Sequence, residues 1–299
     1  TSKSNAIGQG IGTAIQEAIQ KAEEEGWKGV VIGNNATNFT VGANLMNVGM
    51  LAMQKDFDTW DKMVNEFQQL TMYMRTSKVP VVIATQGYVF GGGCETLMHC
   101  DAGVIAAESY IGLVEVGVGL IPGGGGTKEF ALRASDSYFE GDVMIPSLIE
   151  RFKTIAMASV ATSGPQAYDY GYLIEGRDRI VTNVKRNIFE AKKDVIRLAV
   201  GYVQPNERKD IKVLGRGGMA ALYAAAHSLK LGNYASEHDI LIAKKVAHVL
   251  CGGDLTGTQE VSEQYLLDIE REAFLSLCGE DKTKERIQHM LENNKPLRN

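Results

Sequence analysis

The chain has 299 residues, enough for one large domain or two ordinary ones. Hydrophobic residues make up 44% and charged residues 22%, with a net charge of −5 and no strongly basic stretch, which excludes a disordered chain and a nucleic-acid footprint. No apolar run reaches the roughly 18 residues of a membrane-spanning helix.

The first half of the chain alternates between helical and strand patterns. Apolar residues at helical spacing predict helices over 9–25 and 57–70, and a further helix that starts near Glu95. Short β-branched runs predict buried strands over 29–33, 79–85 and 102–107. Because helices separate these strands, we expect right-handed crossovers and a largely parallel sheet, an α/β fold.

The second half of the chain lacks strand patterns after Val181. Helical patterns follow over 184–203, 217–231, 238–250 and 260–278, and then a polar tail. This change in composition predicts a domain boundary near residue 185. The expected domains are therefore residues 1–185 and an all-α C-terminal domain of residues 186–299.

The cysteines carry no sign of a disulfide framework or a metal site. Cys94, Cys100, Cys251 and Cys278 form no CxxC pair and have no histidine at zinc spacing. The start of the chain shows no signal-peptide pattern. We therefore expect reduced thiols, no metal and a cytoplasmic location.

Three glycine-rich stretches fail the tests for phosphate binding. In "IPGGGGTK" (121–128) the threonine precedes the lysine, whereas a P-loop needs Gly-Lys-Ser/Thr. "GVGLIPG" (117–123) has proline where the third glycine of a dinucleotide motif belongs, and "IGQGIG" (7–12) has its third glycine one position early. Nucleotide hydrolysis and dinucleotide binding by this chain are therefore disfavoured.

A glycine triplet follows the strand at 79–85 and precedes the helix near Glu95. Glycine allows a ligand close to the unpaired N–H groups at a helix start, and such groups can stabilise an oxyanion. "NFTVGANL" (38–45) follows the neighbouring strand and offers Gly42 and Ala43. Ligands of parallel sheets bind at the carboxyl ends of the strands, so the two loops can converge.

Two glutamates are candidates for acid/base chemistry. Glu95 directly follows the glycine turn, and Glu115 lies 20 positions later among apolar residues and glycine. A random glutamate is usually a solvated loop residue. An apolar setting raises the pKa of a carboxyl, which is the condition for proton transfer near neutral pH.

These residues carry a resemblance to a known family. "KVPVVIATQGYVFGGGCETLMHCDAGVIAAESYIGLVEVGVGLIPGGGGTKEF" (78–130) resembles the signature of the crotonase (enoyl-CoA hydratase/isomerase) family. "NFTVGANL" is similar to the first oxyanion loop of that family, with Asn44 where an Asp is common. The resemblance covers about residues 4–185 and weakens after Arg133.

The resemblance implies a crotonase-like fold (a ββα superhelix) and the hydration of trans-2-enoyl-CoA in fatty-acid β-oxidation. It implies that the backbone N–H groups of Ala43 and Gly92 hold the thioester oxygen, and that Glu95 and Glu115 hold the water. The same resemblance assigns substrate contacts to Gly42, Phe90, Gly91, Gly93 and Met46. Isomerisation of the double bond and a non-catalytic acyl-CoA-binding or assembly module are the alternatives.

The C-terminal stretches "HDILIAKKVAHVLCGGD" (238–254) and "EQYLLDIEREAFLSL" (263–277) resemble bacterial proteins that fuse a 3-hydroxyacyl-CoA dehydrogenase to a crotonase domain. This resemblance implies a fragment without the first strand of the domain, with upstream dehydrogenase domains as partners. NAD is then expected only in that dehydrogenase part, with no cofactor in this chain, and a homo-oligomer is an alternative. The apolar faces of the tail, for instance Ile240, Ile242, Val246 and Val249, are expected to leave an exposed patch or to drive self-association.

Overall fold

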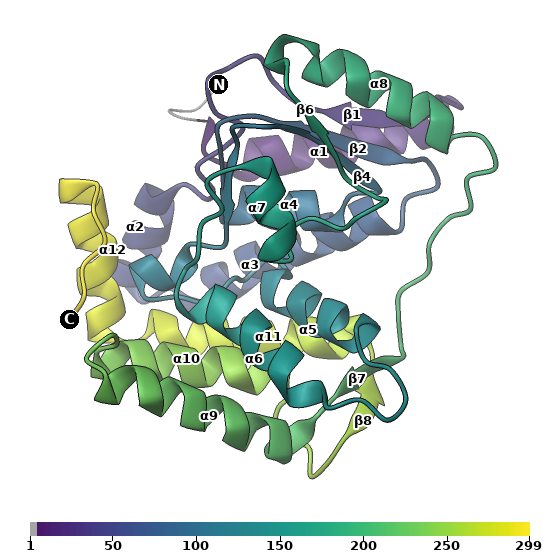
Figure 1. The fold of residues 1–299 in the computed structure, drawn as a ribbon. Coiled ribbons are helices and arrows are strands. Elements are labelled where there is room, and N and C mark those ends of the chain that lie inside the picture. Colours follow the sequence, from purple (N-terminus) through teal and green to yellow (C-terminus); the bar gives the residue numbers. More distant parts are fainter. Residues whose placement is uncertain (1–4) are drawn as a thin grey trace. The chain divides into compact units, whose positions relative to one another are not determined.

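The computed structural model describes residues 5–299, and the chain folds into two compact units (Figure 1). Unit 1 comprises Thr1–Asn44, Glu66–Gly112 and Val160–Glu207. Unit 2 comprises Leu45–Asn65, Leu113–Ser159 and Arg208–Asn299. No edge of these units falls at residue 185. The expected domain boundary near that residue stays a prediction.

A four-stranded parallel sheet forms the centre of unit 1. Its order is β1-β2-β4-β6, with β1 (Val30–Ile32), β2 (Val81–Thr85), β4 (Ala102–Ala106) and β6 (Arg179–Val181). Every residue of β2 and β4 is buried, as expected of parallel strands covered on both faces. The predicted parallel sheet and its first three strands are therefore confirmed.

Two short strands continue from the sheet toward the glycine loops. β3 (Tyr88–Phe90) follows β2 after Gly87, β5 (Tyr110–Gly112) follows β4, and the two pair in parallel. The sequence did not predict these strands, because three residues are too few to show a period. β3 carries the chain from the main sheet to the Gly91–Gly93 turn, and β5 carries it toward η2 (Glu115–Val118).

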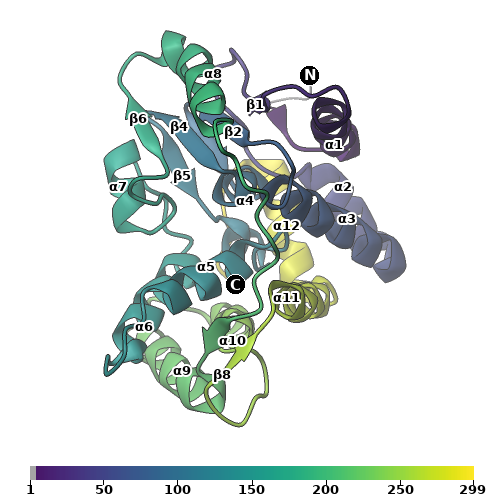
Figure 2. The ribbon, with the colours of Figure 1, turned by 90° about the vertical axis from the view of Figure 1, so that its right-hand side faces the viewer.

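Helices flank the sheet of unit 1 (Figure 2). They are α1 (Gln9–Glu24), α4 (Gly92–His99), α7 (Gly164–Asp169) and α8 (Asn187–Leu198), with a short 3-10 helix η3 (Val184–Arg186). Ala191 and Val195 of α8 join Val82 and Val104 of the sheet in one apolar cluster. This packing explains why α8 belongs with the sheet rather than with the helices that follow it.

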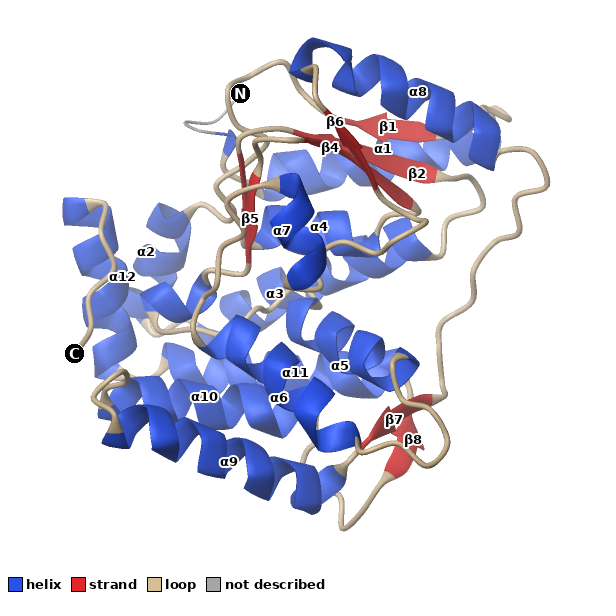
Figure 3. Cartoon of the chain, in the orientation of Figure 1, coloured by secondary structure: helices blue, strands red, loops and turns tan. Residues whose placement is uncertain are grey.

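Unit 2 consists mainly of helices, shown in blue in Figure 3. They are α2 (Leu45–Gln54), the 3-10 helix η2 (Glu115–Val118), α5 (Gly126–Asp136), α6 (Met144–Ala156), α9 (Gly215–Leu231), α10 (Glu237–Leu250), α11 (Glu263–Cys278) and α12 (Asp281–Asn293). The long helix α3 (Phe57–Arg75) has residues in both units.

Two features correct the expected all-α C-terminal region. β7 (Ile211–Val213) and β8 (Gln259–Val261) form a two-stranded antiparallel sheet. α12 occupies the expected polar tail, and its buried residues are Thr283, Arg286 and Ile287. The sequence hid both features, because each strand has three residues and the buried stripe of α12 is mostly polar.

The expected exposure of the tail at four named positions is wrong. Ile240 is 5% exposed, and Ile242, Val246 and Val249 are fully buried. All four lie on α10, which packs against α5, α6, α9 and α11 within unit 2. Unit 2 therefore covers these faces with its own helices.

Residues 5–299 contain no helix that is long and apolar enough to cross a membrane. They also contain no group of three His, Cys, Asp or Glu side chains able to hold a metal ion. All four cysteines are free and buried, as predicted for reduced thiols.

Candidate active site

The peptide bond between Gly42 and Ala43 is oriented so that the Ala43 N–H group points away from the neighbouring segment at Ile7. The carbonyl of Gly42 accepts from the Ile7 N–H at 2.8 Å, and the Asn44 N–H donates to the Ile7 carbonyl at 3.2 Å. In a trans peptide the N–H points opposite to the carbonyl, so the Ala43 N–H points away from Ile7. Gly42 has φ +94°, a backbone angle that favours glycine, which permits this turn.

The turn that follows β3 orients a second N–H group in the same unit. Gly91 has φ 52° and ψ −124°, its N–H donates to the Gly112 carbonyl at 3.0 Å, and its carbonyl accepts from the Glu95 N–H at 2.9 Å. Because the Gly91 carbonyl points along α4, the Gly92 N–H points out of the N-terminal end of that helix.

The two loops lie against each other within unit 1. A methyl group built on Gly42 would lie 3.0 Å from the Phe90 carbonyl oxygen and 3.6 Å from the Gly92 nitrogen. A methyl group on Gly93 would lie 2.1 Å from the Thr40 Cγ2 atom, so glycine is required there by close approach. The sequence prediction that these two loops converge is therefore confirmed.

Glu95 lies in the first turn of α4, directly after the glycine turn. Its side chain is 2% exposed, and every residue of α4 is buried. The amides at the N-terminus of a helix carry partial positive charge, which favours a carboxylate in the first turn. α4 thus places Glu95 and the Gly92 N–H on one short element.

Glu115 lies in unit 2 as the first residue of η2. Its Oε2 atom is enclosed without a hydrogen-bond partner. Burial raises the pKa of Glu115 to about 7, the negative charge of Glu270 adds to the rise, and backbone hydrogen bonding partly offsets it. A carboxyl with this pKa exists in both protonation states near neutral pH, as acid/base catalysis requires.

Glu270 of α11 is the neighbouring charge, and the sequence analysis missed it. Its carboxylate accepts from the N–H groups of Gly125 at 2.7 Å, Thr127 at 2.9 Å and Lys128 at 3.0 Å. The glycine-rich "IPGGGGTK" stretch therefore offers its helix-start amides to a carboxylate of the same chain. The helical spacing of Glu270 with Leu266 and Phe274 could have revealed it, because all three lie on the buried stripe of α11.

The remaining candidate residues occupy two different settings. Phe90 ends β3 and stacks on Tyr88, with ring centroids 4.8 Å apart and an interplanar angle of 18°. Met46 lies on α2 in unit 2 and is 64% exposed. The structure thus brings Gly42, Ala43, Phe90, the glycine triplet and Glu95 together in unit 1, whereas Met46 and Glu115 belong to unit 2.

The chain is similar to known proteins in sequence and in fold. The family model described as "Enoyl-CoA hydratase/isomerase" matches residues 1–141. These residues belong to the crotonase family. The matched range includes the candidate residues of unit 1 and, separately, Met46 and Glu115 of unit 2.

Two comparisons extend along the rest of the chain. A relative from Bacillus subtilis (strain 168), named "Probable 3-hydroxyacyl-CoA dehydrogenase", is 43% identical over 298 residues, which are 100% of this chain and 37% of that protein. The crystal structure of an enoyl-CoA hydratase from Bacillus halodurans superposes with a TM-score of 0.62 at 17% identity, covering 96% of this chain and 91% of that one. The second comparison shows that the fold is crotonase-like.

A third comparison is shorter. The "Fatty acid oxidation complex subunit alpha" of Idiomarina loihiensis is 33% identical over 124 residues, which are 41% of this chain and 17% of that protein. The chain thus spans little more than a third of the Bacillus subtilis relative and a smaller part of this one. Both of these relatives are therefore much longer than this chain.

Proposed function

We propose that this crotonase-family chain adds water across the double bond of trans-2-enoyl-CoA thioesters to give 3-hydroxyacyl-CoA. The observation that carries the proposal is the pair of N–H groups of Ala43 and Gly92, on two adjoining loops of unit 1. These two donors would bind the thioester oxygen as negative charge develops on it. Loss of one such donor typically raises the barrier by about 3–4 kcal/mol.

The proton transfers are assigned to Glu95 and Glu115. The water oxygen bonds to C3 of the enoyl group, one carboxylate takes the proton that water loses, and one carboxylic acid supplies a proton to C2. The pKa of Glu115, raised to about 7, suits it to either role. The mechanism requires both carboxyls to reach one water, so that they titrate as a coupled pair.

Substrate contacts are proposed for Gly42, Phe90, Gly91, Gly93 and Met46. The glycines would allow the thioester close to the backbone, and the apolar side chains of Phe90 and Met46 would contact the acyl chain. Hydration transfers no electrons, so the reaction itself needs no redox cofactor.

The longer relatives suggest the setting of this reaction. The Bacillus subtilis relative is named as a dehydrogenase of 3-hydroxyacyl-CoA, which is the compound that hydration produces. We propose that the parent protein carries such a dehydrogenase elsewhere, and that NAD binds to that part. A cytoplasmic location is part of the same proposal.

The test follows the ultraviolet absorbance of crotonyl-CoA, which falls as its conjugated double bond is hydrated. We expect turnover by the wild-type chain, and a loss of about 10²–10⁴ in rate for both Glu95→Gln and Glu115→Gln. Acyl-CoA affinity should change by no more than a few-fold. Glu108→Gln, an exposed glutamate of unit 1, is the matched control.

Three outcomes separate the alternatives. Near-wild-type turnover in either variant removes that glutamate from the mechanism. Conversion of a 3-enoyl-CoA without hydration of crotonyl-CoA would identify an isomerase. Acyl-CoA binding without either reaction would identify a non-catalytic binding module.

A further inference from the structure

We propose that Thr283 and Arg286 of α12 are positioning residues that orient Glu115 by holding both ends of η2. This inference rests on the proposed function for its catalytic meaning, but its structural part can be tested separately. All the residues involved lie in unit 2. Neither side chain is assigned contact with substrate, so their effect would be exerted through Glu115.

Thr283 holds the C-terminal end of η2. Its side chain is fully buried, and its Oγ1 donates to the Gly119 carbonyl at 2.9 Å. Gly119, which follows η2, has φ +86°, and a methyl group there would lie 2.8 Å from the Thr283 Cα and Oγ1 atoms. The backbone after η2 therefore touches α12 directly, with no space for another side chain.

His238 of α10 completes the hydrogen bonding of Thr283. Its Nε2 lies 3.0 Å from the Thr283 Oγ1. Because the single hydroxyl proton goes to the Gly119 carbonyl, we infer that the His238 Nε2–H donates to the hydroxyl oxygen. Burial, together with the positive charges of Arg286 and Lys282, lowers the pKa of His238 to about 4, so that this imidazole is neutral at pH 7.

Arg286 holds the N-terminal part of η2. Its side chain is 1% exposed, and its Nη1 donates to the Val116 carbonyl at 3.3 Å and to the Asp239 carboxylate at 2.8 Å. Its Nη2 donates to the Ser236 hydroxyl at 3.3 Å and its Nε to the Asn299 side chain at 2.8 Å. The guanidinium is therefore fixed by several partners and can in turn fix the Val116–Gly117 peptide, one residue after Glu115.

Asp239 and Ser236 are themselves held at the start of α10. The Ser236 Oγ accepts from the Asp239 N–H at 3.1 Å, and the Asp239 carboxylate accepts from the Ser236 N–H at 2.8 Å. This reciprocal cap stabilises the helix start and anchors the partner of Arg286. The contacts thus connect η2 to α10 and α12.

η2 depends on such contacts, because a 3-10 helix of four residues has little stability of its own. The Glu115 Oε2 atom makes no hydrogen bond, so this oxygen gains no orientation from a partner of its own. The backbone held by Thr283 and Arg286 supplies that orientation. A misplacement of about 1 Å in a reacting group can cost on the order of 10² in rate.

The experiment compares Thr283→Val, which removes the hydroxyl at nearly constant volume, with Thr283→Ser, which retains it. We expect Thr283→Val to lower kcat about 10-fold or more with KM within about threefold, and Thr283→Ser to recover most of the activity. Arg286→Lys keeps the charge but loses the forked geometry, and should also lower kcat. Gln288→Ala, on the exposed face of α12, is the control and should match the wild type.

A second measurement distinguishes this inference from the proposed function. The titration of the Glu115 carboxyl is followed by isotope-edited infrared or NMR spectroscopy, with Glu115→Gln identifying its signal. If Thr283 orients the carboxyl, Thr283→Val should move the midpoint from about 7 toward the ordinary range of glutamate, while Thr283→Ser leaves it unchanged.

The results that overturn the inference are specific. A folded Thr283→Val chain with the wild-type titration midpoint would show that the hydroxyl does not orient Glu115. If the wild type lacks hydratase activity, the proposed function fails, and the titration still decides the positioning role. Folding of each variant is checked by its thermal midpoint, and Arg286→Lys replaces Thr283→Val if the latter unfolds.

Discussion

Glu95 and Glu115 show how two identical side chains come to lie in different electrostatic surroundings. Glu95 is buried in the first turn of α4, where the helix amides favour its negative charge. Glu115 has an enclosed oxygen without a partner and a neighbouring negative charge on Glu270. The settings of the two carboxyls therefore differ, which suits one acid and one base.

The raised pKa of Glu115 has a consequence for stability. The folded chain binds a proton at Glu115 up to about pH 7, whereas the unfolded chain loses it near the model value of 4.5. Between these two values the folded state holds more protons, so this group lowers the free energy of unfolding as pH rises. The slope is at most about 1.4 kcal/mol per pH unit, because one proton at most distinguishes the two states.

Denaturant unfolding between pH 4.5 and 7 measures this contribution. As pH rises through this range, we expect the free energy of unfolding to fall less in Glu115→Gln than in the wild type. At lower pH the two chains should show the same pH dependence. Glu108→Gln, at an exposed position, should leave the wild-type slope in place. An unchanged slope in Glu115→Gln would mean that its carboxyl titrates as in the unfolded chain.

At the scale of the elements, carboxylates of α11 bind polar groups at the start of α5. Glu270 of α11 supplies acceptors for three N–H groups at the start of α5, which its own helical bonds cannot satisfy. Lys128 of α5 is fully buried and pairs with Glu263 of α11 at 3.3 Å. The glycine-rich loop is thereby joined to α11 at two points within unit 2.

We expect Glu270→Gln to lower the free energy of unfolding by about 1–3 kcal/mol, because an amide replaces one of two acceptor oxygens. Removal of the negative charge should also lower the pKa of Glu115, since Glu270 raises it. Denaturant unfolding and the titration of Glu115 measure these two effects. Glu272→Gln, exposed on the same helix, is the control, and equal behaviour of the two variants would contradict the capping role.

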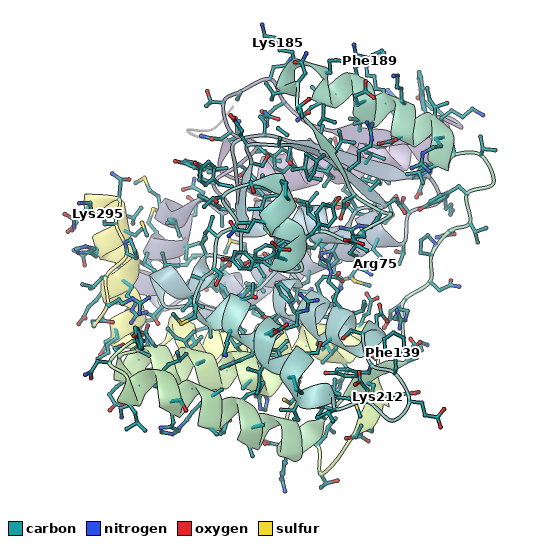
Figure 4. The ribbon with its side chains drawn as sticks, viewed as in Figure 1. Arg75, Phe139, Lys185, Phe189, Lys212 and Lys295 are labelled. Carbon is teal, nitrogen blue, oxygen red and sulfur yellow. The ribbon has the colours of Figure 1, made fainter. Side chains whose placement is uncertain are left out.

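At the scale of the whole molecule, the exposed apolar residues of the C-terminal part lie elsewhere than expected. α10 is covered, whereas Phe189, Ile196, Val200 and Val203 are 52–83% exposed on α8 and the segment after it. Figure 4 shows Phe189 pointing away from α8. Arg186 and Lys193 lie over its ring at 5.0 and 4.7 Å, so cations surround this apolar side chain.

We expect the isolated chain to self-associate through these side chains, because exposed apolar groups lose contact with water on association. Size-exclusion chromatography with light scattering should give a mass above that of the monomer at high protein concentration. Ile196→Ser combined with Val200→Ser should return the monomer mass. If the wild-type chain keeps the monomer mass at every protein concentration, the prediction is wrong.

The sequence by itself determined the buried parallel strands, the two glycine loops at their ends and the glutamate that follows the second loop. Each of these depends on residues close together in the chain: a continuous apolar run for a strand, or glycine where a helix begins. The stretch over residues 78–130 also carried the resemblance to the family. Local patterns were sufficient here because backbone conformation is set by neighbouring residues.

Only the tertiary structure decided what surrounds Glu115. Glu270 meets the start of α5 across more than 140 residues, and Arg286 meets Val116 across 170. Helical periodicity places Glu270 on a buried stripe, whereas Arg286 lies in the expected polar tail. In neither case does the local sequence say which polar groups the side chain will meet. A buried charge requires a partner, and the partner is chosen by packing between distant segments, which no local pattern records.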